Sequence, residues 1–322
     1  MKAAWLFPGQ GSQSVGMARD VLEASPAARV VFERADAALA GTWDGEGGSL
    51  SRLILEGPEN ALTLTANAQP ALVATSCAIL AAIRELAPDV PDPAMTAGHS
   101  LGEYTALVAA GALSLEDAVR LVRIRGRAMQ EAVPPGTGAM AAIMGIEPAR
   151  LDALCARAAQ GEVLSPANFN APGQIVVAGH AGSVARLVDL VTAEKGRAIP
   201  LKVSAPFHCA LMAPAARVVE AELARTEVRS PRLPVVANFD ARPNGDAARA
   251  KELLVRQVDG AVRWEESVRL MAAEGVTHAL EIGPGKVLAG LVKRIAKEIR
   301  VLSVGDAATV GQVSAFLAEA SG

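Results

Sequence analysis

The chain has 322 residues and a formal net charge of −3, and 51% of its residues are hydrophobic. This length is comfortable for two domains, and the apolar content is ample for a core. The small negative charge gives no reason to expect nucleic acid or an anionic membrane as a partner. Cys77, Cys155 and Cys209 lack the paired short spacing of a disulfide framework or a metal site. Pro8 interrupts the N-terminal apolar residues too early for a signal peptide, and no run approaches the ~18 apolar residues of a membrane span. We therefore expect a soluble, cytoplasmic protein.

The first part of the chain predicts an alternation of strands and helices. Residues 3–7 form a buried strand, and a Pro-Gly-Gln-Gly-Ser-Gln loop follows at 8–13. The loop is not a dinucleotide-binding fingerprint, because Ser14 stands where G-x-G-x-x-G requires its third glycine. We interpret it as a tight turn that exposes backbone amides. Helices are expected at 15–24, 26–40, 70–86, 103–110 and 115–132, with a glycine-rich surface loop at 42–49.

Residues 98–102, Gly-His-Ser-Leu-Gly, lie between a short apolar run at 93–97 and a helical pattern. A serine between glycines, where a strand turns into a helix, is typical of a nucleophile elbow. The flanking glycines let the two backbones approach closely, which exposes the Ser100 hydroxyl at the top of the turn. The backbone N–H of Leu101 would then point to where an oxyanion forms. The strand and helix on either side favour a nucleophile over a purely structural turn.

Arg125 lies on the apolar side of the helix expected at 115–132. At about 3.6 residues per turn it falls between Leu121 and Met129. An arginine on an apolar face is costly unless it meets an anion. Taken alone, the pattern favours an ion pair with a core carboxylate, and the alternative is a bidentate site for a substrate carboxylate. The arginines expected on the opposite, solvated side are Arg120, Arg123 and Arg127.

The composition changes at residue 134, where a Pro-Pro-Gly-Thr-Gly stretch begins. Beyond it the sequence predicts strands at 139–144, 162–168, 174–178 and 198–203, with helices at 147–160 and 182–195. This βαββαβ order is that of a ferredoxin-like unit. We therefore expect a small domain at 134–203, inserted into a large α/β domain formed by 1–133 and 204–322. The later elements are strands at 234–239, 278–282 and 300–304 and helices at 247–258, 264–273 and 286–298.

An activated serine needs a general base, usually histidine, and the chain offers four. His99 adjoins the serine, so its side chain should leave the backbone in another direction and pack under the elbow. His180 is expected at the start of a helix, and His278 at the start of a strand. His208 follows the inserted domain in a Pro-Phe-His loop, so by elimination it is the favoured base. No acidic residue stands out as a third triad member, which leaves a backbone carbonyl to orient the histidine.

Several ordered stretches together resemble one family. They are Phe-Pro-Gly-Gln-Gly-Ser-Gln at 7–13, Gly-His-Ser-Leu-Gly-Glu-Tyr at 98–104, Arg-Gly at 125–126, Ala-Asn-Phe-Asn-Ala-Pro-Gly-Gln at 167–174, Ala-Pro-Phe-His at 205–208 and Glu-Ile-Gly-Pro-Gly at 281–285. They are similar to the malonyl-CoA:acyl carrier protein transacylases of fatty acid synthesis and to the related acyltransferase domains of polyketide synthases. The likeness runs from Phe7 to about Lys297. It implies a hydrolase-like α/β core with a mainly parallel sheet and an inserted ferredoxin-like domain.

The resemblance implies a role for each residue that matches a motif. Ser100 would be the nucleophile and His208 its base, with the backbone amides of Leu101 and Gln10 as the oxyanion hole. Arg125 would hold the malonyl carboxylate, which reverses the preference for a structural ion pair.

Three further residues have implied roles. The main-chain carbonyl of Gln257 would orient the histidine. Phe207 would leave little room for an α-methyl branch on the acyl group. Arg197 would contact the phosphates of coenzyme A.

The implied reaction is ping-pong. Malonyl passes from malonyl-CoA to the serine, and then to the phosphopantetheine thiol of an acyl carrier protein. No permanently bound cofactor and no metal are expected, and nothing demands more than a monomer. The basic stretch at 292–297 could dock an acidic carrier protein, although a solvated helix face is the favoured interpretation. The alternatives are a trans-acting acyltransferase of a polyketide synthase, a serine thioesterase or esterase, and a carrier-binding scaffold without activity.

Overall fold

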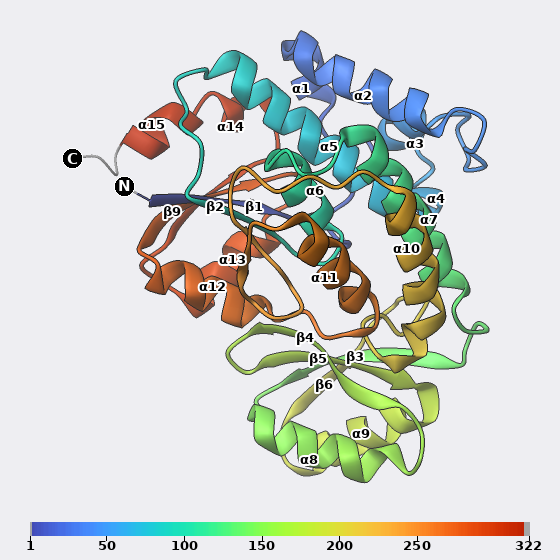
Figure 1. Ribbon diagram of the computed structural model, residues 1–322. Helices are drawn as coiled ribbons and strands as arrows, with labels where there is room; N and C mark the ends of the chain where they lie inside the picture. The colour runs from blue at the N-terminus through green and yellow to red at the C-terminus, as the bar shows by residue number, and fades with distance from the viewer. Residues whose placement is uncertain (1, 319–322) are drawn as a thin grey trace.

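The computed structural model describes residues 2–318, which form two sheets surrounded by helices (Figure 1). The larger sheet contains β1 (Lys2–Phe7), β2 (Met95–Gly98), β7 (Val235–Val236), β8 (Pro243–Asn244), β9 (Val276–Ile282) and β10 (Arg300–Val304). The smaller sheet contains β3 (Gly138–Met144), β4 (Leu164–Ala171), β5 (Gln174–His180) and β6 (Arg197–Pro200). The helices before β3 are α1 (Arg19–Ala24), α2 (Pro26–Leu39), α3 (Leu50–Glu56), α4 (Glu59–Thr63), α5 (Thr65–Leu86), α6 (Gly102–Ala109) and α7 (Leu115–Glu131). Those after β3 are α8 (Pro148–Ala159), α9 (Ala181–Ala193), α10 (Ala213–Arg225), α11 (Ala247–Asp259), α12 (Trp264–Ala273), α13 (Val287–Ile295), α14 (Ala307–Val310) and α15 (Val313–Ala318).

The larger sheet has the strand order β10-β9-β1-β2-β7-β8, and its strands pair in parallel except for β7 with β8. Helical crossovers between parallel strands cover both faces of this sheet, including both faces of the central strand β1. Trp5 and Phe7 pack into the core that includes α2, α5 and α7, whereas Ala4 and Leu6 pack with α12 and α13. Successive side chains of β1 therefore point to opposite faces of the sheet and pack into two different hydrophobic cores. The mainly parallel sheet of the expected fold class is confirmed.

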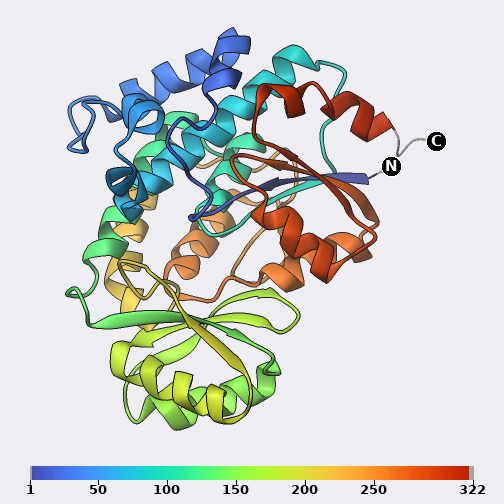
Figure 2. The same ribbon diagram turned by 180° about the vertical axis from the view of Figure 1, so that it is seen from behind.

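The smaller sheet has the order β4-β5-β3-β6, with every neighbouring pair antiparallel. This is the arrangement expected of a ferredoxin-like βαββαβ unit. Figures 1 and 2 show α8 and α9 on the face turned away from the larger sheet. Ala141 and Ile143 of β3 face these helices, whereas Met140 and Ala142 join the main core. The sheet therefore turns one face toward the rest of the protein, and the domain limits at 134–203 stay a prediction.

Several elements differ from the expectation. Helix α5 begins at Thr65, although its proline at position 70 suggested a later start, because the residues of its first turn are buried and packing outweighs the lost hydrogen bond. No element was expected where α3, α4 and α10 lie. Helix α10 had a readable signal, since Ala215, Ala216, Val219 and Leu223 form a buried stripe at helical spacing.

Arg123 corrects a further expectation, because it is 7% exposed and not on a solvated face. Its guanidinium donates to Asn67 and forms a salt bridge with Asp44, and it stacks 4.6 Å from the ring centroid of Trp43. The glycine-rich segment that carries Trp43 and Asp44 therefore folds over α7. Contacts with Asn67 of α5 and with the 43–44 segment surround the guanidinium, and helical periodicity does not indicate contacts with segments distant in sequence.

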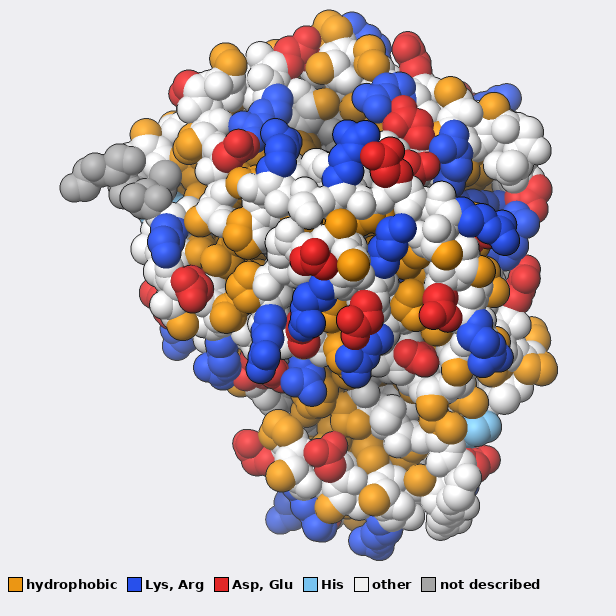
Figure 3. All heavy atoms as spheres, viewed as in Figure 1, with side chains coloured by type: hydrophobic (Ala, Val, Ile, Leu, Met, Phe, Trp, Pro, Cys, Tyr) orange, Lys and Arg blue, Asp and Glu red, His pale blue; other side chains and the backbone are white. Residues whose placement is uncertain are grey.

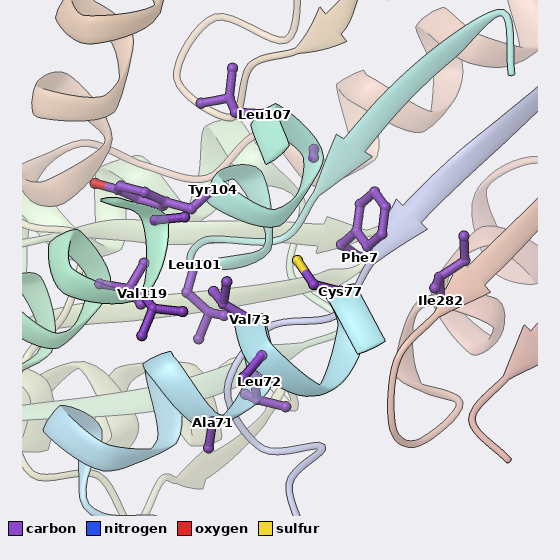
Figure 4. Close-up of a cluster of buried hydrophobic side chains, with 14 of the residues drawn as sticks. Phe7, Ala71, Leu72, Val73, Cys77, Leu101, Tyr104, Leu107, Val119 and Ile282 are labelled. Atoms are coloured by element: carbon purple, nitrogen blue, oxygen red, sulfur yellow. The ribbon is translucent and has the colours of Figure 1, made fainter. Parts of the chain in front are cut away.

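Helix α5 also corrects the expectation that no segment could span a membrane. Thr65–Leu86 is long and apolar enough by length and composition alone. However, 83% of its apolar window is buried inside the protein, as in the core helix of a globular domain. Figure 4 shows why: Leu72, Val73 and Cys77 of this helix pack with Phe7 and Leu101 beneath the end of β1.

Charged side chains of both signs are interspersed over the face in Figure 3, with no large area of one sign. This distribution accords with the net charge of −3.

Candidate active site

A cavity of about 250 Å³ opens at the carboxyl ends of β1 and β2, between the two sheets. This edge of a parallel sheet is where ligands bind in open α/β folds. The cavity is lined by residues from the larger part of the chain (Gln10, Gly11, Gln13, Thr63, Gln69, His99, Ser100, Leu101, Arg125, Met129) and by residues from the smaller sheet and its return loop (Met140, Asn168, Leu201, Lys202, Val203, Phe207, His208). Both sheets thus contribute walls to one site.

Ser100 lies on a sharp turn between β2 and α6, with a φ of 52°. A left-handed conformation is unusual for a residue with a side chain and is typical of a nucleophile elbow. The glycines around it are required by close approach. A β-carbon on Gly98 would lie 1.9 Å from the Gly102 backbone, and one on Gly102 would lie 2.2 Å from the Phe7 oxygen. The turn therefore raises Ser100 into the cavity while strand and helix cross beneath it.

His208 receives the Ser100 hydroxyl at 2.8 Å, measured from Oγ to Nε2. Its other ring nitrogen, Nδ1, lies 2.8 Å from the backbone oxygen of Gln257. A carbonyl oxygen only accepts, so Nδ1 carries the proton and the neutral ring presents Nε2 as an acceptor. Burial, with a smaller effect from positive Arg125, lowers the pKa of His208 to about 3. The ring is therefore neutral at pH 7 and ready to take the serine proton.

Arg125 is 1% exposed and donates from Nη2 to Ser100 Oγ at 3.0 Å. Its other partners are Gln69 Oε1 at 2.7 Å and Gln257 Oε1 at 2.9 Å, and its guanidinium lies 5.7 Å from the ring centroid of Tyr104. Burial lowers its pKa, but arginine remains charged in proteins. None of the salt bridges among residues 2–318 involves Arg125. The core carboxylate that its position first suggested is therefore not its direct partner.

Two residues beside Ser100 have backbone N–H groups without a hydrogen-bond acceptor among residues 2–318. Leu101 follows the serine at the start of α6, and Gln10 lies in the loop after β1; both line the cavity. Neither N–H donates a hydrogen bond within the part of the chain that the structure describes. The Ser100 N–H, by contrast, donates to Asn238 Oδ1 at 2.7 Å. Unused amides beside a nucleophile are suited to an oxyanion.

A buried polar network lies behind the elbow. Gln257 Nε2 donates to the Ser100 carbonyl at 2.9 Å and to Glu103 Oε2 at 2.8 Å. Glu103 Oε2 also receives the Asn238 N–H at 2.9 Å, and Asn238 Nδ2 donates to the Gly98 carbonyl at 2.7 Å. Burial raises the pKa of Glu103 to about 7. Of these residues, the sequence pointed only to the backbone of Gln257. Glu103 lies within the motif at 98–104, and no sequence pattern indicated Asn238.

The remaining candidate residues differ in whether they line the reaction cavity. Phe207 is buried in the cavity wall beside His208. Arg197 begins β6, pairs with Met144 and does not line the cavity. His99 lines the cavity next to Ser100, with Nε2 2.9 Å from Asn170 Oδ1 and its ring centroid 5.6 Å from that of Trp264.

Two other expectations concern absences. The three cysteines are buried as free thiols. Among residues 2–318, no three His, Cys, Asp or Glu side chains gather in a group that could hold a metal ion.

Comparison with known proteins assigns the chain to a family. The family described as "Acyl transferase domain" matches residues 4–315. The malonyl CoA-acyl carrier protein transacylase of Escherichia coli strain K12 is 48% identical over 306 residues, which cover 94% of this chain and 96% of the relative. The transacylase of the same name from Bacillus subtilis strain 168 is 47% identical over 314 residues, covering 96% of this chain and 95% of the relative.

Solved structures agree. The acyl carrier protein S-malonyltransferase of Vibrio cholerae superposes with a TM-score of 0.92 at 46% identity, covering 97% of this chain and 100% of that one. A malonyl-transacylase solved in complex with a type II polyketide acyl-carrier protein gives a TM-score of 0.91 at 43% identity, covering 97% of this chain and 99% of that one. With a family match across nearly its whole length, this chain belongs to the acyl transferase family.

Proposed function

We propose that this protein transfers a malonyl group from malonyl-CoA to the phosphopantetheine thiol of an acyl carrier protein, with Ser100 as the nucleophile that carries the group. The observation that supports this most is the environment of Arg125. A buried cation with neutral hydrogen-bond partners lies 3.0 Å from the serine oxygen. An acyl group with a free carboxylate would supply the missing counter-ion, whereas acetyl would leave the cation unpaired.

In the first half-reaction the Ser100 oxygen attacks the thioester carbon while His208 Nε2 takes the hydroxyl proton. The carbonyl oxygen becomes an oxyanion held by the backbone N–H groups of Leu101 and Gln10, a contribution of roughly 3 kcal/mol per donor. The C–S bond then breaks, and the coenzyme A thiolate leaves with the proton returned by His208. Arg125 holds the distal carboxylate and thereby fixes the acyl group for attack.

The second half-reaction reverses these roles. The thiol of the carrier's phosphopantetheine gives its proton to His208 and attacks the malonyl ester on Ser100. Collapse of the tetrahedral intermediate returns the proton to the serine oxygen and leaves malonyl on the carrier. The Gln257 carbonyl holds the ring in one tautomer through both halves, which gives an orienter without an acidic triad member.

The specificity and setting of the enzyme follow from the same residues. Phe207 would narrow the wall beside the acyl carbon and disfavour a methylmalonyl group. Arg197 would act at the coenzyme A phosphates, outside the reaction cavity. We further propose a soluble cytoplasmic monomer that needs no permanently bound cofactor or metal. The carrier could belong to fatty acid or to polyketide synthesis, since the similar proteins include a transacylase bound to a polyketide carrier.

A serine thioesterase or esterase is the second candidate, because an elbow with a histidine suits hydrolysis equally well. Incubation with malonyl-CoA followed by intact-mass measurement, with and without a pantetheinylated carrier protein, distinguishes the two. Transfer predicts a malonyl adduct that is absent in Ser100→Ala and that passes to the carrier. Rapid release of free malonate without a carrier would refute the proposal and favour the hydrolase.

A further inference from the structure

Glu103 is a buried carboxyl group one helical turn beyond the nucleophile. It is 3% exposed in the first turn of α6 and does not line the cavity. Its Oε2 accepts two hydrogen bonds, from the Asn238 backbone at 2.9 Å and from Gln257 Nε2 at 2.8 Å. Burying a carboxyl is costly, so a group placed here calls for an explanation beyond packing.

The acceptor on Glu103 decides which way round the Gln257 amide lies. Glu103 Oε2 acts as an acceptor, so the Gln257 side chain must present its NH₂ group to it. The same NH₂ group donates to the Ser100 carbonyl at 2.9 Å. The carbonyl end, Oε1, must then face Arg125 Nη2, from which it accepts at 2.9 Å. With the amide reversed, two donors would face each other at Arg125 and two acceptors at Glu103.

This orientation does not depend on the ionisation of Glu103. Two N–H groups point at Oε2, so a proton on the carboxyl would reside on the other oxygen. Oε2 remains an acceptor in both states.

We infer that Glu103 is a positioning residue for acyl-group selection: its Oε2 orients the Gln257 amide, and that amide holds the Arg125 guanidinium beside Ser100. The inference rests on the proposed function, because only a substrate with a carboxylate would bind the Arg125 guanidinium directly. A guanidinium held by Gln69 on one nitrogen and Gln257 on the other is fixed in plane, as bidentate binding of a carboxylate requires. Loss of the hydrogen bond from Arg125 to Gln257 should therefore weaken malonyl binding and leave acetyl transfer comparatively unaffected.

The experiment compares kcat/KM for malonyl-CoA and acetyl-CoA in Glu103→Met, Glu103→Gln and Gln257→Met. Glu103→Met removes the acceptor, and we expect the malonyl-to-acetyl ratio to fall roughly 10- to 100-fold. Glu103→Gln keeps an oxygen acceptor and should stay within about threefold of the wild type. Gln257→Met keeps the backbone carbonyl that orients His208, and should lower the ratio as far as Glu103→Met does. In the double variant Glu103→Met/Gln257→Met, the malonyl-to-acetyl ratio should be no lower than in Gln257→Met alone.

Glu281→Gln is the matched control, because Glu281 is also a fully buried carboxyl but accepts from the Leu288 and Ala289 amides at the start of α13. Its ratio should match that of the wild type even if the variant is less stable.

Equal loss of both activities in Glu103→Met, or an unchanged ratio in Gln257→Met, would overturn the inference. Gln257→Met decides the matter if Glu103→Met does not fold. Failure of the proposed function itself would look different, since the wild type would then show no preference for malonyl.

Discussion

Arg125→Ala should reduce malonyl transfer far more than acetyl transfer. Two charge-assisted hydrogen bonds to the malonyl carboxylate, at about 1.5–3 kcal/mol each, correspond to a loss of roughly one hundred- to ten-thousand-fold in kcat/KM for malonyl-CoA. Acetyl-CoA has no carboxylate, so it loses only the contact from Nη2 to Ser100 Oγ at 3.0 Å. That single charge-assisted bond, valued on the same scale, predicts a loss of roughly ten- to one hundred-fold, and malonyl-CoA loses it in addition to its carboxylate contacts.

Arg123→Ala supplies a matched control on the same helix. Arg123 is also a buried arginine, but it bonds Asn67 and Asp44 and does not line the reaction cavity. Its removal should lower the melting temperature without changing the malonyl-to-acetyl ratio.

The assay measures kcat/KM for both acyl-CoA substrates with a pantetheinylated carrier, alongside thermal unfolding of each variant. Equal losses for the two substrates in Arg125→Ala would refute the reasoning and return Arg125 to a structural role. A selective loss in Arg123→Ala would also count against it, because the selectivity would then not come from the site.

The remaining predictions concern the pH dependence of activity and of stability, two glycines and Phe207. Because the pKa of His208 is lowered to about 3, kcat/KM should stay flat from about pH 5 to pH 8, and an ascending limb near the ordinary 6.5 would contradict the assigned burial. The same shift means that the unfolded chain binds a proton that the folded chain does not. The raised pKa of Glu103 has the opposite effect between about 4.5 and 7, so thermal unfolding should show the contribution of His208 as a fall in stability when the pH drops from about 4.5 toward 3. Gly102→Ala should lower both the melting temperature and the activity, because its β-carbon would lie 2.2 Å from the Phe7 backbone oxygen. Gly290→Ala in α13 is the control: no atom lies within 4 Å of its β-carbon, so it should raise the free energy of unfolding by about 0.5–1 kcal/mol. A stable and active Gly102→Ala variant would disprove the close approach. Phe207→Ala should raise the methylmalonyl-to-malonyl ratio of kcat/KM about tenfold, and an unchanged ratio would remove Phe207 as a specificity wall.

Local sequence patterns determined much of this protein. The elbow at 98–102 was readable because its glycines are a local requirement of a strand that turns directly into a helix. The smaller sheet was readable for the same reason, since strand and helix periodicities within 134–203 spell out a βαββαβ unit. Ser114, a typical N-cap residue, directly precedes the helix that carries Arg125, and its side chain accepts from the Asp117 N–H at 3.0 Å.

Tertiary structure decided the rest. Arg123 and Arg125 are two residues apart on one helix, and their sequence context could not tell which would face a loop and which a cavity. The answer depended on a glycine-rich segment folding over one of them and on Gln69 and Gln257 approaching the other. The same limit applies to the partners of Glu103, which lie more than a hundred residues away along the chain. Periodicity records the direction of a side chain relative to its own helix, but the charge, acceptors and burial around it come from segments distant in sequence. A nucleophile could therefore be found from its own turn, and the family resemblance pointed to Arg125 as the carboxylate-binding residue. The neutral partners that leave this cation without a counter-ion came only from the assembled fold.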